Sequence, residues 1–194
     1  MKDMLKNGLA LFLLVVALSS CRKEPNFPDE PHIQYLRVEQ SRAPLEQGQD
    51  PRIARDIISI VIRFQDGDGN LGLSSTIKED TEAPFNFGSP YYNNFIANLL
   101  IREQDPNGGY RFVPYPFPEL SSEFNQRFPR VSNDDRKEPL EGELKYTTEA
   151  FDSDIFAPGT VVKFELFIYD RTTPVPHKSN VIVTDEITLF PDLI

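Results

Sequence analysis

The sequence of 194 residues contains no tryptophan, one cysteine and two histidines. A single cysteine cannot close a disulfide within the chain, so packing must stabilise the fold without covalent help. The histidines, His32 and His177, lie among prolines and share no helix face, which leaves a zinc-hydrolase site unsupported. No G-x-S-x-G nucleophile motif is present either, so the sequence favours a role other than catalysis.

The chain also lacks an apolar run of the roughly 20 residues that a transmembrane helix needs. The uncharged apolar run at residues 9–18 is too short for one. It follows a start that carries two lysines, and it precedes Ser19, Ser20 and Cys21. This layout is typical of a secretory signal peptide, so we expect residues 1–20 to be removed.

Cys21 is the residue at which that segment ends. The string LSSC at residues 18–21 resembles the lipobox of bacterial lipoproteins. The resemblance implies diacylglycerol on the Cys21 sulfur, cleavage after Ser20 and acylation of the new amino terminus. Because two or more acyl chains hold a protein firmly, we expect a permanent lipid anchor in the cell outer membrane. The alternative is a structural cysteine in a buried amino-terminal helix.

The segment after Cys21 has the composition of a tether. Residues 22–31 include three prolines and several charges, so we expect residues 21–31 to be extended and flexible, ahead of one domain over residues 32–194. Arg22, Lys23 and Glu24 resemble the charged signals that carry such lipoproteins to the outer face of the cell. That resemblance implies a surface-exposed domain.

Acidic residues outnumber basic ones by 30 to 20, which gives a formal net charge of −10. This balance opposes binding to nucleic acid, where neutralisation of phosphate by Lys and Arg dominates affinity. It equally opposes lying flat on anionic lipid. Its simplest role is to keep an exported domain soluble.

Alternating apolar and polar residues predict strands along most of the chain. The pattern is clearest at residues 57–64, whose inward face would hold Ile58, Ile60, Ile62 and Phe64. The expected strands are residues 33–38, 57–64, 95–103, 110–115, 140–146, 160–170 and 181–189. The last of them should face inward at Val181, Val183, Ile187 and Leu189. The spacer DPNGG at 105–109 is strong turn chemistry, so the strands on either side should pair as a hairpin.

About seven strands, turn-rich connections and no long helix favour an all-β fold, a single immunoglobulin-like antiparallel β-sandwich. A small barrel is the main alternative. Residues 74–92 and 114–139 are rich in Pro, Asn, Ser and aromatic residues and do not read as strands. We expect them to be long loops at the ends of the sandwich, and loops of that length are usually functional or mobile.

The string DGDGN follows the clearest strand directly, at residues 66–70. Asp66, Asp68 and Asn70 alternate with glycines, which lets the backbone curl so that several oxygens converge. Calcium takes six to eight such oxygen ligands. The match to an EF-hand is poor, because Leu71 stands where that loop requires glycine. A tight turn without metal and a calcium site therefore both remain open.

A wider resemblance includes this string. FQDGDGNLG at residues 64–72, with a later DR pair at 170–171 and an SN pair at 179–180, resembles strings that recur in small lipoproteins of Bacteroidota-type bacteria. The resemblance implies an immunoglobulin-like lipoprotein rather than a particular activity. It also suggests a geometry in which the DGDGN string lies near Asp170 and Asn180.

Asp170 is the fourth candidate metal ligand. It lies on the inward face of its expected strand, where a carboxylate must be hydrogen-bonded, paired with an arginine or bound to metal. Arg171 or Arg63 is the simpler partner to expect.

Aromatic residues cluster before and after the expected hairpin. Exposed aromatic side chains stack on sugar rings or anchor protein partners. We take the candidate binding residues to be Tyr91, Tyr92, Tyr115 and Phe117. The alternative is that the aromatic segments fold back as a minor core.

The sequence as a whole predicts a cell-envelope lipoprotein that serves as a binding or structural module, with a protein or glycan partner. One alternative is an envelope hydrolase acting on glycan, because carboxylates are plentiful although no two stand out as a catalytic pair. Another is an accessory subunit of an envelope transport complex.

Overall fold

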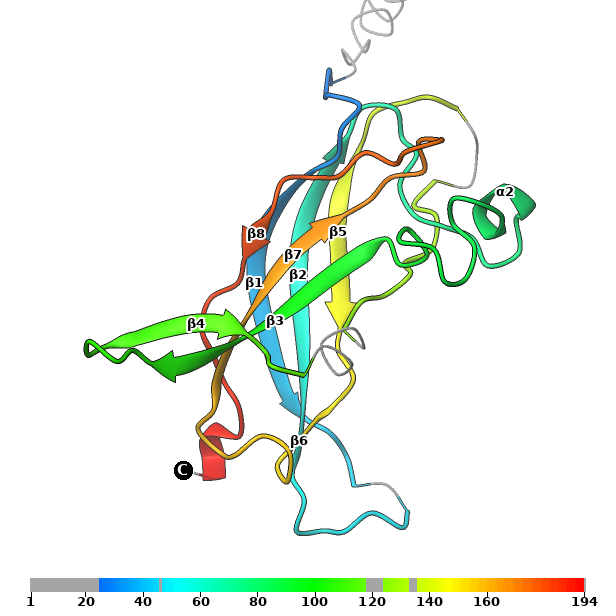
Figure 1. Ribbon diagram of the computed structural model, residues 1–194. Helices are drawn as coiled ribbons and strands as arrows, with labels where there is room; N and C mark the ends of the chain where they lie inside the picture. The colour runs from blue at the N-terminus through cyan, green and yellow to red at the C-terminus, as the bar shows by residue number, and fades with distance from the viewer. Residues whose placement is uncertain (1–24, 46, 118–123, 133–135, 194) are drawn as a thin grey trace, which may run out of the picture.

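The computed structural model describes residues 25–45, 47–117, 124–132 and 136–193, and their regular structure is almost entirely β-strand. Two antiparallel sheets pack face to face (Figure 1). The predicted all-β sandwich is therefore confirmed. The immunoglobulin-like assignment stays a prediction.

The first sheet has the strand order β1-β2-β5, and the short β6 pairs with the beginning of β2. Its strands are β1 (His32–Arg42), β2 (Arg55–Asp66), β5 (Leu140–Thr147) and β6 (Phe151–Asp152). As the central strand, β2 has a hydrogen-bonded neighbour on each side. The inward residues predicted for β2, from Ile58 to Phe64, are all buried.

The second sheet has the order β4-β3-β7-β8, with β9 also paired to β7. Its strands are β3 (Phe95–Gln104), β4 (Tyr110–Pro114), β7 (Val161–Ile168), β8 (Ile182–Val183) and β9 (Ile187–Thr188). The predicted hairpin of β3 and β4 is confirmed, and it projects to one side of the sandwich (Figure 1). Within the described residues, the helical elements are α2 (Lys78–Thr81) and the 3-10 helix η1 (Pro191–Leu193).

The core lies between the inward faces of β2 and β7 and is rich in phenylalanine. Two ring pairs stack across it, Phe95 on Tyr146 at 4.5 Å and Phe124 on Phe151 at 5.2 Å between centroids. Phe85 and Phe128 are buried as well, so the aromatic segments do largely fold back on the body of the domain. Each large apolar side chain removed from water contributes about 1.5–3 kcal/mol.

The strand predicted at 181–189 is wrong in two respects. It is split into β8 and β9, and Val181 and Val183 face outward with 45% and 47% of their surface exposed. Thr184 causes the break, because its hydroxyl accepts the Phe164 backbone N–H at 3.0 Å in place of a strand carbonyl. The alternation therefore changes phase between the two halves, and only Ile187 and Leu189 reach the core as predicted.

Two asparagine side chains form paired hydrogen bonds with a backbone, as a neighbouring strand would. Asn180 pairs with the backbone of Ile33, receiving its N–H at 2.8 Å and donating to its carbonyl at 2.9 Å, and so links the two sheets. Asn94 pairs in the same way with the backbone of Phe128. The SN pair at 179–180 thus has a structural role at the edge between the sheets, where Ile33 lies opposite Phe64 near the end of β2.

The described part of the tether, residues 25–31, is docked at its end rather than free. Pro31 is buried, Phe27 is half-buried, and the Pro28 carbonyl accepts the Gly67 N–H at 2.8 Å. These contacts fix the entry of the chain at the upper end of the sandwich in Figure 1.

Replacing Phe164 with alanine should destabilise the domain by about 3–5 kcal/mol, because its fully buried ring would leave a cavity between the sheets. Phe87→Ala is the matched control, since that ring is 84% exposed and its loss should change stability by no more than about 0.5 kcal/mol. Urea unfolding followed by circular dichroism measures both. Equal losses would contradict the assignment of the core.

Candidate functional site

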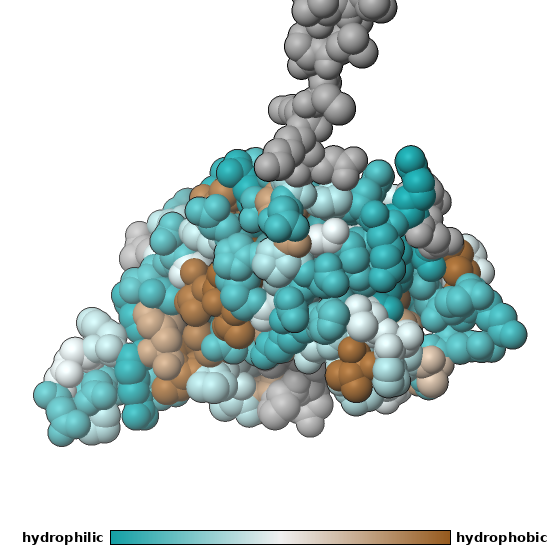
Figure 2. All heavy atoms as spheres, turned by 90° about the horizontal axis from the view of Figure 1, so that it is seen from above, coloured by the Kyte–Doolittle hydropathy of each residue, from teal (hydrophilic) through white to brown (hydrophobic). Residues whose placement is uncertain are grey.

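Two loops meet at the end of the sandwich where the tether enters. Asp66 is the last residue of β2, and Asp170 follows β7 by two residues. The backbones of Leu71 and Asp170 form an isolated antiparallel bridge, and the Arg171 N–H donates to the Asn70 carbonyl at 3.2 Å. The expected approach of the DGDGN string to Asp170 is therefore found. Seen from above in Figure 2, this end is mainly hydrophilic.

The DGDGN string leaves three buried oxygens without a hydrogen bond. Asp66 Oδ2 accepts the Asn70 N–H at 2.9 Å, and the Asn70 side-chain amide donates to Asp68 Oδ2 at 2.8 Å and to the Thr172 hydroxyl at 3.1 Å. The remaining oxygens, Oδ1 of Asp66, Asp68 and Asn70, accept nothing from any described residue. Asp66 itself has no exposed surface.

The glycines of the string are required by close packing on both sides. A Cβ on Gly67 would lie 2.4 Å from the Phe27 carbonyl oxygen of the tether. A Cβ on Gly69 would lie 2.5 Å from the Glu138 carbonyl oxygen, and Gly69 has φ of +69°, which disfavours other residues. The loop is thus held between the tether and the segment before β5.

Several carboxyl groups lie close together at this end. Burial, together with the neighbouring Asp68 and Asp170 carboxylates, raises the pKa of Asp66 to about 7. Burial also raises the pKa of Asp68; Asp170 and Asp29 add to that shift, and the positive charge of Lys137 opposes it. Both carboxyl groups are therefore costly to ionise, and a cation bound close to them would lower that cost.

Asp170 is satisfied by neutral donors. Its Oδ1 accepts the N–H groups of Thr172 and His177, and its Oδ2 accepts the Thr172 hydroxyl and lies 2.9 Å from His177 Nδ1. An arginine partner was expected, but Arg171 turns instead to the carbonyls of Leu71 and Gly72. A role of Asp170 as metal ligand stays a prediction, and here its carboxylate orients the His177 ring.

A cleft of about 450 Å³ opens over these loops. Its lining includes acidic, basic and neutral polar side chains: Asp29 of the tether, Asp68, Asn70, Arg136, Lys137, Arg171 and His177. Among the described residues, no three His, Cys, Asp or Glu side chains are grouped so that they alone could hold a metal ion. A cation here would need the Asn70 amide oxygen, backbone carbonyls or water in addition to the carboxylates.

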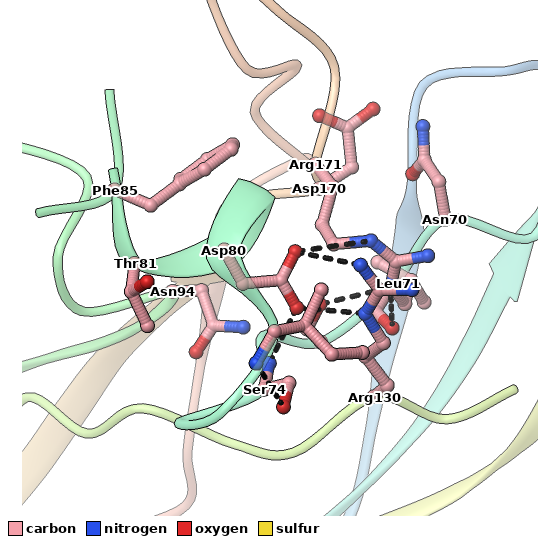
Figure 3. Close-up of polar contacts among 12 residues, drawn as sticks. Asn70, Leu71, Ser74, Asp80, Thr81, Phe85, Asn94, Arg130, Asp170 and Arg171 are labelled. Carbon is pink, nitrogen blue, oxygen red and sulfur yellow. Dashed lines mark hydrogen bonds and ion pairs between the residues drawn. The ribbon is translucent and has the colours of Figure 1, made fainter. Parts of the chain in front are cut away.

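A second polar cluster lies beside the first and has no counterpart in the sequence predictions. Asp80, at 1% exposure, accepts two hydrogen bonds from Arg130 at 2.7 and 2.8 Å and the Ser74 N–H at 2.6 Å. Arg171 Nε lies 4.0 Å away (Figure 3). These residues are up to 97 positions apart in the chain, so no local sequence motif predicts that they meet.

Arg127 completes the second cluster through backbone carbonyls. It donates to Ser74 O at 3.0 Å, to Tyr92 O at 2.9 Å and to the carbonyl of Asp80. The cluster therefore fixes the segment from Ser74 to Tyr92, including α2, against the body of the domain. Its arginines are used for structure rather than presented to solvent.

The candidate binding aromatics do not form one patch. Tyr91 packs edge-on against Tyr169, and Tyr92 packs against Phe87. Tyr115 and Phe117 lie after β4 and contact each other at 5.5 Å, with Phe156 beside Tyr115. Phe117 is 56% exposed, whereas the three tyrosines are half-buried. Their roles in binding stay predictions.

No family model, curated protein or solved structure matches the chain. Cys21 and the signal-peptide pattern lie outside the described residues. Within those residues, no helix combines the length and apolar character needed to cross a membrane. The functional argument therefore rests on the geometry of this chain.

Asp80→Asn should lower the free energy of unfolding at pH 7 by about 3 kcal/mol, because it removes the charge with which Arg130 pairs. Burial alone would raise the pKa of Asp80, but the hydrogen bonds from Arg130 and Ser74 and the charges of Arg130 and Arg171 hold it below 3.8. A carboxyl group whose pKa is lower in the folded state stabilises the fold at pH values above its unfolded-state pKa. This stabilisation is lost as the pH falls. The difference between wild type and variant should thus be constant above about pH 5 and shrink below pH 3.8. Urea unfolding across pH 3–7 measures it, and a difference that grows on acidification would contradict the assignment.

Proposed function

We propose that the protein is an outer-membrane lipoprotein, anchored through Cys21, whose sandwich domain binds a protein partner in the cell envelope. The observation that carries this proposal is an apolar face on the outer side of the second sheet. A role as accessory subunit of an envelope complex is one form of the same function.

This outer face follows from strand alternation. Because alternate residues of β7 point into the core, Lys163, Glu165 and Phe167 point outward. The register of β3, β4 and β8 on β7 brings further apolar residues to that side. We call this set the outer aromatic face, and it consists of Ile96, Leu100, Phe112, Phe167, Tyr169 and Val183.

Cations stack on the rings of this region. Lys178 Nζ lies 3.7 Å from the Phe167 centroid and Lys163 Nζ lies 4.5 Å from that of Phe112. Arg102 covers Tyr110 in the same way at 4.8 Å. A sugar would need those ring faces for stacking, so the arrangement favours a protein partner over a glycan. Aromatic residues and arginine are also the residue types enriched in protein interfaces.

The opposite face of the sandwich differs in character. The outward residues of β1 and β5 are charged and cross-linked by ion pairs, such as Lys145 with Glu39 at 2.6 Å. Such a face is well solvated without a partner. The outer side of the second sheet also carries ion pairs, from Arg102 and Lys163 to Glu186, but its additional apolar residues support the proposal that the partner binds there.

Cys21→Ser should release the protein from the membrane, because it removes the sulfur that carries diacylglycerol in the lipobox interpretation. Cell fractionation followed by immunoblotting measures the distribution. Ser20→Ala is a suitable control, since it keeps the cysteine and a small residue before it. Recovery of the Cys21 variant in the membrane pellet at the wild-type level would contradict the anchor.

A photo-crosslinking residue placed at Val183 should give a discrete covalent adduct in intact cells, because that side chain lies on the outer aromatic face and is 47% exposed. The same residue at Glu143, which is exposed on the outer face of β5, is the matched control and should give none. Denaturing gels with mass spectrometry of the adduct read out the result. Adducts of equal yield at both positions, or at neither, would count against the proposed face.

A further inference from the structure

The four fully buried aspartates of the described chain provide an internal comparison. Asp56 has both oxygens engaged, by Arg42, Gln40 and the Phe190 N–H. Asp80 and Asp170 also have both oxygens engaged, as described above. Asp66 is the exception, because its Oδ1 accepts no hydrogen bond from any described residue.

The exception extends to the rest of the same loop. Four buried side-chain oxygens in the described residues have no hydrogen-bond partner, and three of them belong to Asp66, Asp68 and Asn70. All three are acceptors from alternate residues of one curled string. Leaving a buried polar group unsatisfied destabilises the fold, and a charged group does so more strongly. A fold that satisfies its other buried carboxylates has concentrated this cost at one place.

A proton cannot remove the cost by itself. Protonated Asp66 would supply one donor, which satisfies one further oxygen and leaves another unpaired. A cation held by the loop would supply these acceptors with a common partner and would offset the repulsion that the neighbouring carboxylates exert on Asp66 and Asp68. The donor set is also chemically selective, because carboxylate and amide oxygens suit hard cations such as calcium rather than soft metals.

We propose that the DGDGN loop binds one Ca²⁺ ion through Oδ1 of Asp66, Asp68 and Asn70. Calcium is preferred to magnesium because it accepts six to eight oxygens in flexible geometry. The adjoining cleft leaves room for water molecules to complete the coordination. Asp170 holds the neighbouring His177 loop in place and adds negative charge to the site.

The same site secures the tether. The Gly67 N–H donates to the Pro28 carbonyl from inside the calcium loop, and Asp29 lines the cleft beside Asp68. Ordering of the loop by calcium therefore also orders residues 27–29 against the domain. Given the lipid anchor proposed above, on which this inference rests, calcium sets how freely the domain moves on the membrane.

The test uses the full-length protein purified in detergent and freed of metal with a chelator. Calcium at a hundredfold excess over its dissociation constant should raise the melting temperature by roughly 5–10 °C. The Asp68→Ala variant, altered at a half-exposed position, should keep its circular dichroism spectrum and lose the response. Asp105→Ala, in the glycine-rich turn of the β3–β4 hairpin, is the matched control and should respond like wild type.

Titration calorimetry with Ca²⁺ alone and with Mg²⁺ alone gives an independent measurement. One calcium per chain, with at least tenfold weaker magnesium binding, is the expected result. An unchanged melting temperature with no binding heat would overturn the site, and so would an equal response in Asp68→Ala. Equal binding of the two ions would overturn the assignment to calcium.

Hydrogen exchange tests the connection to the tether. Calcium should slow exchange of the Gly67 amide at least tenfold, because the acceptor of that amide is Pro28. The Gly108 amide, which donates within the distant hairpin turn, is the control and should be unchanged. Calcium binding without protection of Gly67 would overturn the tether connection while leaving the metal site intact.

Discussion

The packing of β2 against β7 is the constraint on which the rest of this structure depends. Their inward rows form the centre of the core, and both strands end at the same end of the sandwich. The next inward-facing residue after the last apolar one of each strand is an aspartate: Asp66 follows Phe64, and Asp170 follows Ile168. Both carboxylates are fully buried for that reason.

The fold treats its buried carboxylates in different ways. Asp170 is satisfied by N–H and hydroxyl donors of the loop that follows it, and Asp80 by an arginine that comes from a distant segment. Asp66 Oδ2 accepts the Asn70 N–H of its own loop, whereas its Oδ1 accepts no hydrogen bond from any described residue. This difference, rather than the acidic composition, makes the DGDGN loop the distinctive site of the domain. Arg171 connects the two clusters, since it reaches the Leu71 and Gly72 carbonyls and lies near Asp80.

Much of this arrangement could be predicted from the sequence. Period-two alternation identified β2, β7 and the hairpin of β3 and β4, because a strand buried on one face must alternate. The same alternation placed Asp170 on an inward face. It failed at residues 181–189, because the Thr184 hydroxyl replaces a strand carbonyl and so changes the phase of the pattern. When a side chain takes the place of a backbone group as hydrogen-bond partner, the periodic pattern of the sequence does not reveal it.

The sequence by itself determined most of the strands and the glycine-rich turn chemistry, since each depends on neighbouring residues, and lipid attachment stays a prediction of the same local kind. Tertiary structure decided which donors satisfy each buried acid and which aromatic residues stay at the surface. Arg130 meets Asp80, and Pro28 meets Gly67, only because the two sheets bring distant segments together. Contacts of that kind depend on the path of the whole chain, and no local pattern of residue types records them.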